Sequence, residues 1–193
     1  REYEEVCNRL GVIDFAELLL RALELWRDHP AVLDHYQQRF QHILVDEFQD
    51  TNAVQYAWLR LLAGKRSGVT AVGDDDQSIY GWRGAKVENI LHYERNYPDT
   101  HTVKLEQNYR STSNILTAAN AVISKNAERL GKSLWTDSGE GEPIALYAAF
   151  NEHDEARYIA DRLQTWVNQG NLREDSAILY RSNAQSRVLE AAL

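Results

Sequence analysis

The sequence has few of the features that define secreted, disulfide-bonded or membrane-spanning proteins. It contains a single cysteine, Cys7, in 193 residues. One cysteine excludes an internal disulfide and a cysteine-rich zinc site, and it fits a reducing compartment. No apolar run approaches the roughly 20 residues that a membrane helix needs. We therefore expect a cytoplasmic protein that does not enter a membrane.

Positive charge is also scarce. The 21 Lys and Arg residues are outnumbered by 29 Asp and Glu residues, which gives a formal net charge of −8. This balance counts against a protein that coats nucleic acid through overall basicity. It still allows a local groove that binds nucleic acid through aromatic side chains and a few arginines.

Apolar and polar residues alternate in a way that predicts an α/β fold with parallel sheet character, preceded by a helical segment at 1–40. The pattern predicts helices at 15–26, 32–40, 53–63, 87–97, 113–125 and 152–167, and strands at 43–45, 69–72, 102–105, 144–148 and 177–180. A strand–helix–strand order at 41–73 implies a parallel crossover. A change of domain is expected near 99–104.

The first candidate site is the acidic pair Asp46 and Glu47, which follows the predicted strand 43–45. Open α/β sheets build their sites at the carboxyl ends of neighbouring strands. A carboxylate there suits a hydrated Mg²⁺ that carries substrate phosphates, and a second one can orient the attacking water. The alternative is a pair of solvated acids in a turn.

A second acidic segment, Gly-Asp-Asp-Asp-Gln at 73–77, follows the predicted strand 69–72. Three consecutive acids repel one another unless a cation or an arginine compensates for them. Gln77, placed just beyond them, can contact a terminal phosphate without adding charge. Tyr80 and Trp82 then flank a glycine and could stack on bases; the alternative is that both are core residues.

A third candidate, Gln-Asn-Tyr-Arg-Ser at 107–111, follows the predicted strand 102–105. The guanidinium of Arg110 could reach a phosphate, and the ring of Tyr109 could stack on a purine. An ion pair between Arg110 and a carboxylate of the protein fits the spacing equally well.

Two patterns carry no site. Gly131-Lys132-Ser133 imitates the end of a phosphate-binding loop, but Asn126 stands where that loop needs a glycine, and a helix precedes it instead of a strand. The six histidines show no metal-ligand spacing.

The three motifs at 46–50, 73–85 and 107–111, with two longer stretches at 129–137 and 177–187, resemble the UvrD/Rep/PcrA group of superfamily 1 DNA helicases over essentially all 193 residues. The resemblance implies that ATP and Mg²⁺ are bound by parts of two RecA-like domains of the P-loop NTPase class. It makes Asp46 the Mg²⁺ residue, Glu47 the catalytic base and Gln77 the sensor of the γ-phosphate. Tyr109 would stack on adenine, and Arg110 would act as an arginine finger.

The same resemblance implies that Tyr80 and Trp82 stack on single-stranded DNA and that Arg83 bridges the nucleotide and DNA sites. By this assignment 1–40 is the helical end of a first accessory insert (1B-like), 41–103 is the later part of the first RecA-like domain and 104–193 is the earlier part of the second. The family's Walker A loop and last motifs are not in this sequence. We therefore expect an internal fragment, inactive when isolated, with incomplete sheets whose open edges favour self-association.

For the parent protein the resemblance implies a 3′-to-5′ DNA helicase that acts on single-stranded and forked DNA together with DNA repair proteins. Two alternatives are the motor subunit of a recombination helicase–nuclease and a non-catalytic DNA-binding or interaction module. The presence of Asp46, Glu47, Gln77 and Arg110 argues against the second.

Overall fold

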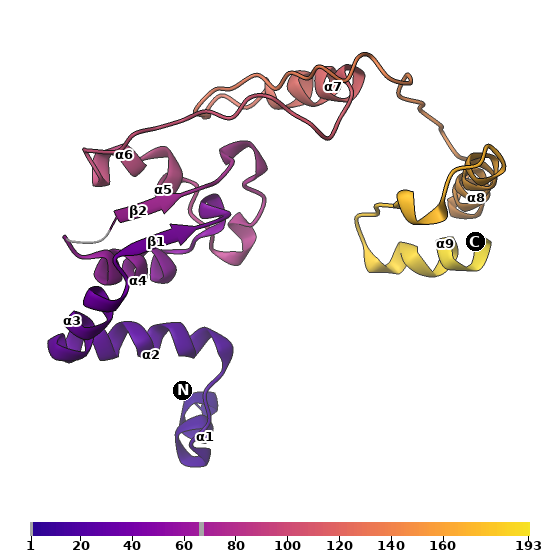
Figure 1. The fold of residues 1–193 in the computed structure, drawn as a ribbon. Helices are drawn as coiled ribbons and strands as arrows, with labels where there is room; N and C mark the ends of the chain where they lie inside the picture. The colour runs from indigo at the N-terminus through magenta and orange to yellow at the C-terminus, as the bar shows by residue number, and fades with distance from the viewer. Residues whose placement is uncertain (1, 66–67) are drawn as a thin grey trace. The chain divides into compact units, whose positions relative to one another are not determined.

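The chain divides into two compact units, Arg1–Gly139 and Glu140–Leu193. The computed structural model describes residues 2–65 and 68–193 (Figure 1). The sequence predicts a change of domain between 103 and 104. The boundary between the two compact units lies at 139–140 and does not test that prediction.

Three helices open the first unit, as predicted for 1–40: α1 (Glu2–Leu10), α2 (Phe15–Asp28) and α3 (Pro30–Arg39). The carboxylate of Asp14 caps α2 by accepting a hydrogen bond of 2.8 Å from the backbone N–H of Glu17. Pro30 begins α3, where its missing N–H costs nothing.

A two-stranded parallel sheet follows, made of β1 (His42–Val45) and β2 (Gly68–Ala71), with α4 (Ala53–Ala63) between them in sequence. Asn52 and Gln55 form a capping box that starts α4. Both strands and α4 were predicted, and the parallel pairing is confirmed. Figure 1 shows α4 alongside the strands.

The core of the first unit lies between the helices and one face of this sheet. Trp26 of α2 packs on Trp58 of α4, with ring centroids 4.7 Å apart, and Ile43 of β1 is buried with them. On the other face Leu44 is 79% exposed. The sheet is therefore covered on one side within this unit.

The 3₁₀ turn η1 (Phe48–Asp50) lies between β1 and α4. Short elements follow β2 and lead to a longer helix: the 3₁₀ turns η2 (Asp75–Gln77) and η3 (Gly81–Arg83), then α5 (Glu88–Leu91), α6 (Tyr93–Asn96) and α7 (Ser113–Ile123). The predicted helix 87–97 is therefore wrong as a single element. It breaks at His92, whose φ of −107° and ψ of 17° lie outside the helical range.

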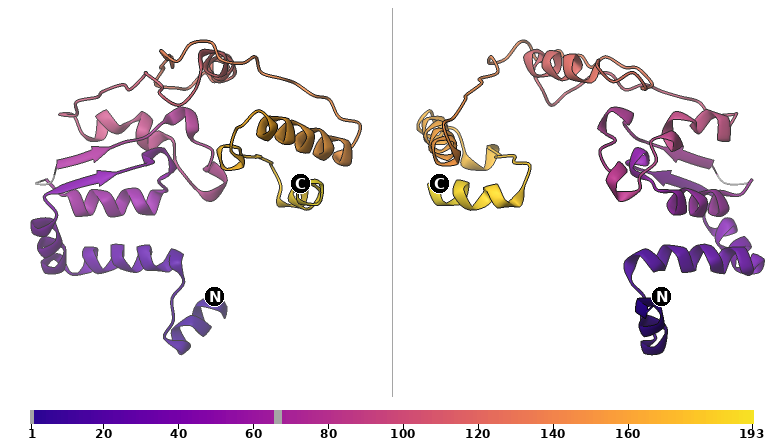
Figure 2. Two further views of the ribbon diagram at one scale, coloured as in Figure 1. Left: turned by 45° about the vertical axis from the view of Figure 1, so that its right-hand side comes forward. Right: turned by 180° about the vertical axis from the view of Figure 1, so that it is seen from behind.

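The second unit holds α8 (Glu152–Asn168) packed with α9 (Ser186–Ala192), together with the 3₁₀ turns η4 (Arg173–Asp175) and η5 (Asn183–Gln185). Figure 2 shows α8 and α9 from two further directions. Among the described residues, no helix combines the length and the apolar character that crossing a bilayer requires.

The strands predicted at 102–105, 144–148 and 177–180 are wrong: none of these segments is a strand in the structure. A strand is stable only when its backbone pairs with a neighbour. The nearest approach is a single parallel bridge between Gln107 and Trp135. Leu146 and Leu179, which would face a core in a paired sheet, are 97% and 94% exposed. The fold is α/β as predicted, with one small parallel sheet in the described residues.

Candidate functional site

The two acidic segments lie side by side at the carboxyl edge of the sheet. Beyond β1 and β2 the backbones stay paired: Val72 donates a hydrogen bond of 2.8 Å to the carbonyl of Val45, and Phe48 donates one of 3.0 Å to the carbonyl of Val72. Asp46 therefore follows one strand and Asp74 follows its neighbour. The expectation that both acidic segments share one edge of the sheet is confirmed.

Glu47 has a left-handed backbone, with φ of 50° and ψ of 45°. It is the only residue other than glycine with a positive φ in the described part of the chain. Such a conformation costs about 1–3 kcal/mol and persists only where neighbouring contacts hold it. Here the N–H of Glu47 donates to Asp46 Oδ1 at 2.9 Å, and its carbonyl accepts from the N–H of Asp50 at 2.9 Å. These contacts fix the orientation of an exposed carboxylate at the sheet edge.

Gln49 joins the two acidic segments and was not among the predicted site residues. Its side chain is 1% exposed; Nε2 donates to Glu47 Oε2 at 2.6 Å, and Oε1 accepts from the N–H of Asp74 at 3.0 Å. A Cβ added at Gly73 would lie 2.7 Å from Gln49 Oε1, so this approach requires glycine. No sequence pattern distinguishes a buried glutamine in an acidic segment from an exposed one.

A cavity of about 310 Å³ opens beside the first acidic segment and is lined by Leu19, Val45, Asp46, Glu47, Asp50, Thr51, Gln55, Trp58 and Leu59. Asp50 Oδ1 is buried without a hydrogen-bond partner. No group of three or more His, Cys, Asp or Glu side chains that could hold a metal lies in residues 2–65 or 68–193. One or two carboxylates with open space suit Mg²⁺, which keeps most of its water.

The second acidic segment is neutralised by cations from a distant part of the chain. Arg129 pairs with Asp76 through two hydrogen bonds of 2.8 Å and 2.5 Å, and Lys132 pairs with Asp74. The need for a compensating charge was predicted, but its source was not. Lys132 belongs to the Gly-Lys-Ser pattern that imitates the end of a phosphate-binding loop. Gln77 is exposed at the end of this segment.

Tyr80, Trp82 and Arg83 form an exposed cluster. Trp82 is 77% exposed, so it is not a core residue, and its ring centroid lies 6.3 Å from that of Tyr80. The guanidinium of Arg83 lies 5.0 Å from the Tyr80 ring and 4.9 Å from the Trp82 ring. Two rings and a cation at the surface can stack on bases and contact phosphate.

This aromatic cluster is tied to the first acidic segment through Thr51. Asn89 Nδ2 donates to the carbonyl and the hydroxyl of Thr51 at 3.1 Å and 3.0 Å, and the N–H of Lys86 donates to the same carbonyl at 2.9 Å. Thr51 itself is buried and its hydroxyl donates to the carbonyl of Phe48 at 2.8 Å. The segment that follows the aromatic cluster is therefore hydrogen-bonded to the end of the first acidic segment.

Tyr109 and Arg110 are both exposed, and Tyr109 donates from its hydroxyl to Gln107 Oε1 at 2.8 Å. Arg110 makes no ion pair with the residues that the structure describes. The alternative of a structural ion pair at Arg110 is therefore not found. Within the same residues no hydrogen bond or ring contact joins Tyr109 or Arg110 to Asp46, Glu47 or Gln77.

Comparison with known proteins identifies two family models along the chain. Residues 1–98 match the UvrD/REP helicase N-terminal domain, and residues 103–193 match the UvrD-like helicase C-terminal domain.

Individual relatives match almost the whole chain. It is 64% identical over 191 residues to DNA helicase II of Escherichia coli (strain K12), covering 99% of this chain and 26% of that protein. DNA helicase II of Haemophilus influenzae is 57% identical, with the same two coverages of 99% and 26%. The ATP-dependent DNA helicase PcrA of Leuconostoc citreum is 50% identical over 192 residues, again with 99% and 26% coverage. The chain thus spans about a quarter of the length of these relatives.

Proposed function

Because the chain belongs to the UvrD/REP helicase family, we propose that it supplies part of the ATP-hydrolysing motor of a DNA helicase. The observation that carries this proposal is the shared sheet edge, where Asp46 and Glu47 lie beside the segment that leads to Gln77. The exposed aromatic cluster is joined to the same edge through Thr51. Hydrogen bonds between a nucleotide site and the segment of a nucleic-acid surface give a physical connection through which the two can be coupled.

In the proposed reaction each residue at the edge has one task. Asp46 would hold Mg²⁺ through its water shell, and the ion would supply positive charge to the phosphate oxygens of ATP. Glu47, fixed by its left-handed backbone and by Gln49, accepts a proton from the attacking water. Gln77 contacts the terminal phosphate with a neutral amide. The cavity beside Asp46 and the unpartnered Asp50 Oδ1 support a polar ligand there.

Tyr109 and Arg110 complete the nucleotide site in this proposal. Tyr109 stacks on the adenine, and Arg110 contacts the phosphates as an arginine finger, a role that contributes about 10³–10⁵ in rate in the enzymes where it is known. Both side chains are exposed, and Arg110 has no ion pair with residues 2–65 or 68–193, which leaves both groups accessible to a ligand.

Single-stranded DNA is the proposed partner of Tyr80, Trp82 and Arg83. Stacking on aromatic rings is independent of base sequence and suits a protein that moves along a strand. Because the chain has a net charge of −8, general positive charge cannot account for DNA binding, and this local cluster has to provide the contacts.

We also propose the finer architecture that the sequence predicts. Residues 1–40 close a first accessory insert, 41–103 belong to one RecA-like domain and 104–193 belong to a second. The two family matches, which divide between 98 and 103, support this division. A 3′-to-5′ polarity and a role in DNA repair with protein partners belong to the same proposal.

Unwinding of tailed duplexes tests the proposal. The full-length protein with Mg²⁺ and ATP should separate a duplex that carries a 3′ single-stranded tail and should leave a blunt duplex of equal length intact at low protein concentration. Equal unwinding of 5′-tailed and 3′-tailed duplexes would contradict the polarity. Absence of unwinding with every tail would contradict the helicase function.

A further inference from the structure

The loop at 129–132, called here the basic loop, contacts all three acids of the second acidic segment. Arg129 binds Asp76 with both Nε and Nη2, and Lys132 binds Asp74 and lies 3.8 Å from Asp76 Oδ2. The backbone N–H of Leu130 donates to Asp75 Oδ2 at 2.8 Å. These contacts join segments more than 50 residues apart in sequence.

The ion pairs are largely shielded from solvent. The side chains of Arg129 and Asp76 are 18% and 11% exposed, and those of Lys132 and Asp74 are 17% and 23% exposed. Removing one partner of such a pair leaves a charge in a poorly hydrated place, which is more disruptive than losing an exposed pair. The basic loop is therefore required for the geometry of the acids.

Asp74, held by the basic loop, in turn orients the side chain of Gln77. Gln77 Nε2 donates to Asp74 Oδ2 at 2.7 Å, while Asp74 Oδ1 accepts from Lys132 and from the N–H of Asp76. Burial alone would raise the pKa of Asp74, but the hydrogen bonds from Lys132, Gln77 and the backbone of Asp76, together with the charge of Lys132, lower the pKa overall. Asp74 is thus held as a carboxylate that orients the side-chain amide of Gln77.

We propose that Arg129 and Lys132 are positioning residues for ATP hydrolysis: they fix Asp74 and Asp76, and Asp74 in turn holds Gln77 in place. This inference rests on the proposed function, in which Gln77 meets the terminal phosphate.

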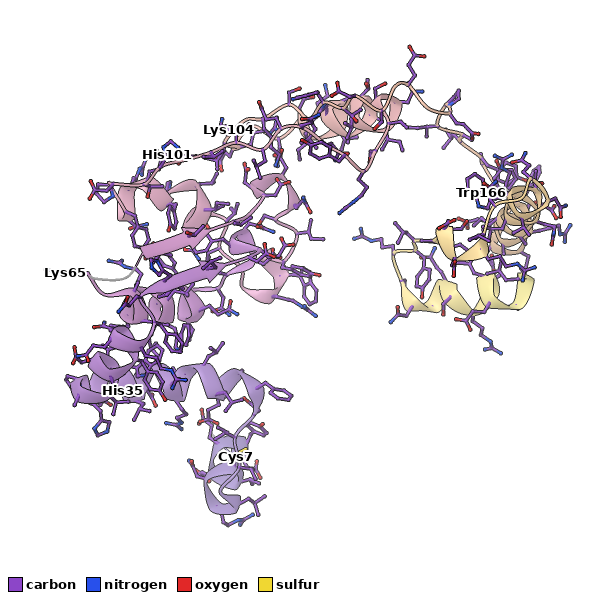
Figure 3. The ribbon with its side chains drawn as sticks, viewed as in Figure 1. Cys7, His35, Lys65, His101, Lys104 and Trp166 are labelled. Carbon is purple, nitrogen blue, oxygen red and sulfur yellow. The ribbon has the colours of Figure 1, made fainter. Side chains whose placement is uncertain are left out.

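The basic loop is also anchored beside the segment that leads to Tyr109 and Arg110. Lys104 Nζ donates to the carbonyls of Leu130 and Gly131 at 3.0 Å and 2.7 Å; Figure 3 labels Lys104 on the extended segment before α7. Further along, the N–H of Asn108 donates to the carbonyl of Trp135 at 2.7 Å. The basic loop therefore connects the segment of Gln77 with the segment of Arg110.

Steady-state hydrolysis by the full-length protein with single-stranded DNA tests the proposal. Lys132→Gln should lower kcat for ATP about 10- to 100-fold, because misplacing a positioned group by about 1 Å has that effect, while KM changes far less. Arg129→Lys keeps the charge but loses the paired geometry, and it should lower kcat by a smaller factor. Lys125→Gln, at an exposed lysine in the same region, is the matched control and should leave kcat unchanged.

The same Lys132 change made in Gln77→Ala protein distinguishes a positioning role of Lys132 from a purely structural one. In Gln77→Ala protein, the added Lys132→Gln change should cause no further loss of kcat, because the group that Lys132 positions is already gone. In protein that keeps Gln77, Lys132→Arg retains the positive charge and should therefore retain most of the wild-type kcat. An equal loss in both backgrounds, or wild-type kcat in Lys132→Gln protein, would overturn the proposal.

The result for Glu47→Gln distinguishes this inference from the proposed function. If that variant loses hydrolysis while Lys132→Gln keeps it, the positioning role alone is wrong. If Glu47→Gln hydrolyses ATP at the wild-type rate, both proposals fail.

Discussion

Gln49 donates a hydrogen bond of 2.6 Å to the carboxylate of Glu47 from a side chain that is 1% exposed. The other end of the same amide accepts from the backbone of Asp74 at 3.0 Å. One buried side chain therefore sets the distance between the residue proposed as catalytic base and the segment that carries Gln77. The two acidic segments behave as one unit, although 25 residues separate Gln49 from Asp74.

Replacing this amide should damage both stability and hydrolysis. Gln49→Leu leaves the N–H of Asp74 without its partner in a buried place, which should cost about 1–3 kcal/mol of unfolding free energy. The same change should lower kcat for ATP because Glu47 loses its support. Urea unfolding and steady-state hydrolysis measure the two effects. Gln38→Leu, at an exposed glutamine of α3, is the control and should stay within about 0.5 kcal/mol; equal effects of the two changes would contradict this role of Gln49.

Replacement by alanine should destabilise the protein at Gly73 but not at Gly81. A Cβ at Gly73 would lie 2.7 Å from Gln49 Oε1 and 3.2 Å from the backbone nitrogen of Phe48, whereas a Cβ at Gly81 would meet nothing within 4 Å. Gly73→Ala should therefore destabilise the protein by about 1–3 kcal/mol, and Gly81→Ala should be close to neutral. Thermal unfolding of the two variants makes the comparison, and similar shifts would argue against the close approach at Gly73.

Truncation of Trp82 should weaken DNA binding without unfolding the protein. Loss of one stacked base contact is worth about 1–3 kcal/mol, which raises Kd for single-stranded DNA about 5- to 150-fold. Fluorescence anisotropy with a labelled oligothymidine measures this change. Trp82→Phe keeps a ring and should retain most of the affinity. Since Trp82 is 77% exposed, a large fall in unfolding temperature in Trp82→Ala protein would show that the side chain is structural.

The stabilising effect of Asp74 should vanish in acid. Burial raises the pKa of Asp74, but the hydrogen bonds from Lys132, Gln77 and the backbone of Asp76, together with the charge of Lys132, lower it below the ordinary value of 3.8 in the folded protein. A carboxyl with a depressed pKa stabilises the fold fully above its unfolded pKa, and this stability is lost as pH falls through the folded value. The difference in unfolding free energy between wild type and Asp74→Asn should thus be constant from about pH 6 to pH 8 and shrink below about pH 4. A difference that grows on acidification would contradict the sign of this shift.

The sequence predicts what depends on neighbouring residues and misses what depends on distant ones. The capping residues Asp14 and Asn52 mark helix starts, and apolar runs that end on acids locate β1, β2 and their shared edge. The contact between Arg129 and Asp76 joins residues 53 apart, so no local pattern reveals it. The strands predicted at 144–148 and 177–180 have the right composition, but strand formation depends on a pairing partner that composition does not identify.

Hydrolysis of ATP by Glu47→Gln protein is the most direct test of the central claim that the carboxyl edge of this sheet is a nucleotide site. The full-length variant should bind single-stranded DNA and a fluorescent ATP analogue as tightly as wild type, because the amide keeps the size and the hydrogen bond to its surroundings. Its DNA-stimulated rate of phosphate release should fall by at least about 10²-fold, since proton acceptance contributes that much. A wild-type rate of phosphate release would show that the catalytic base lies elsewhere and would contradict the account.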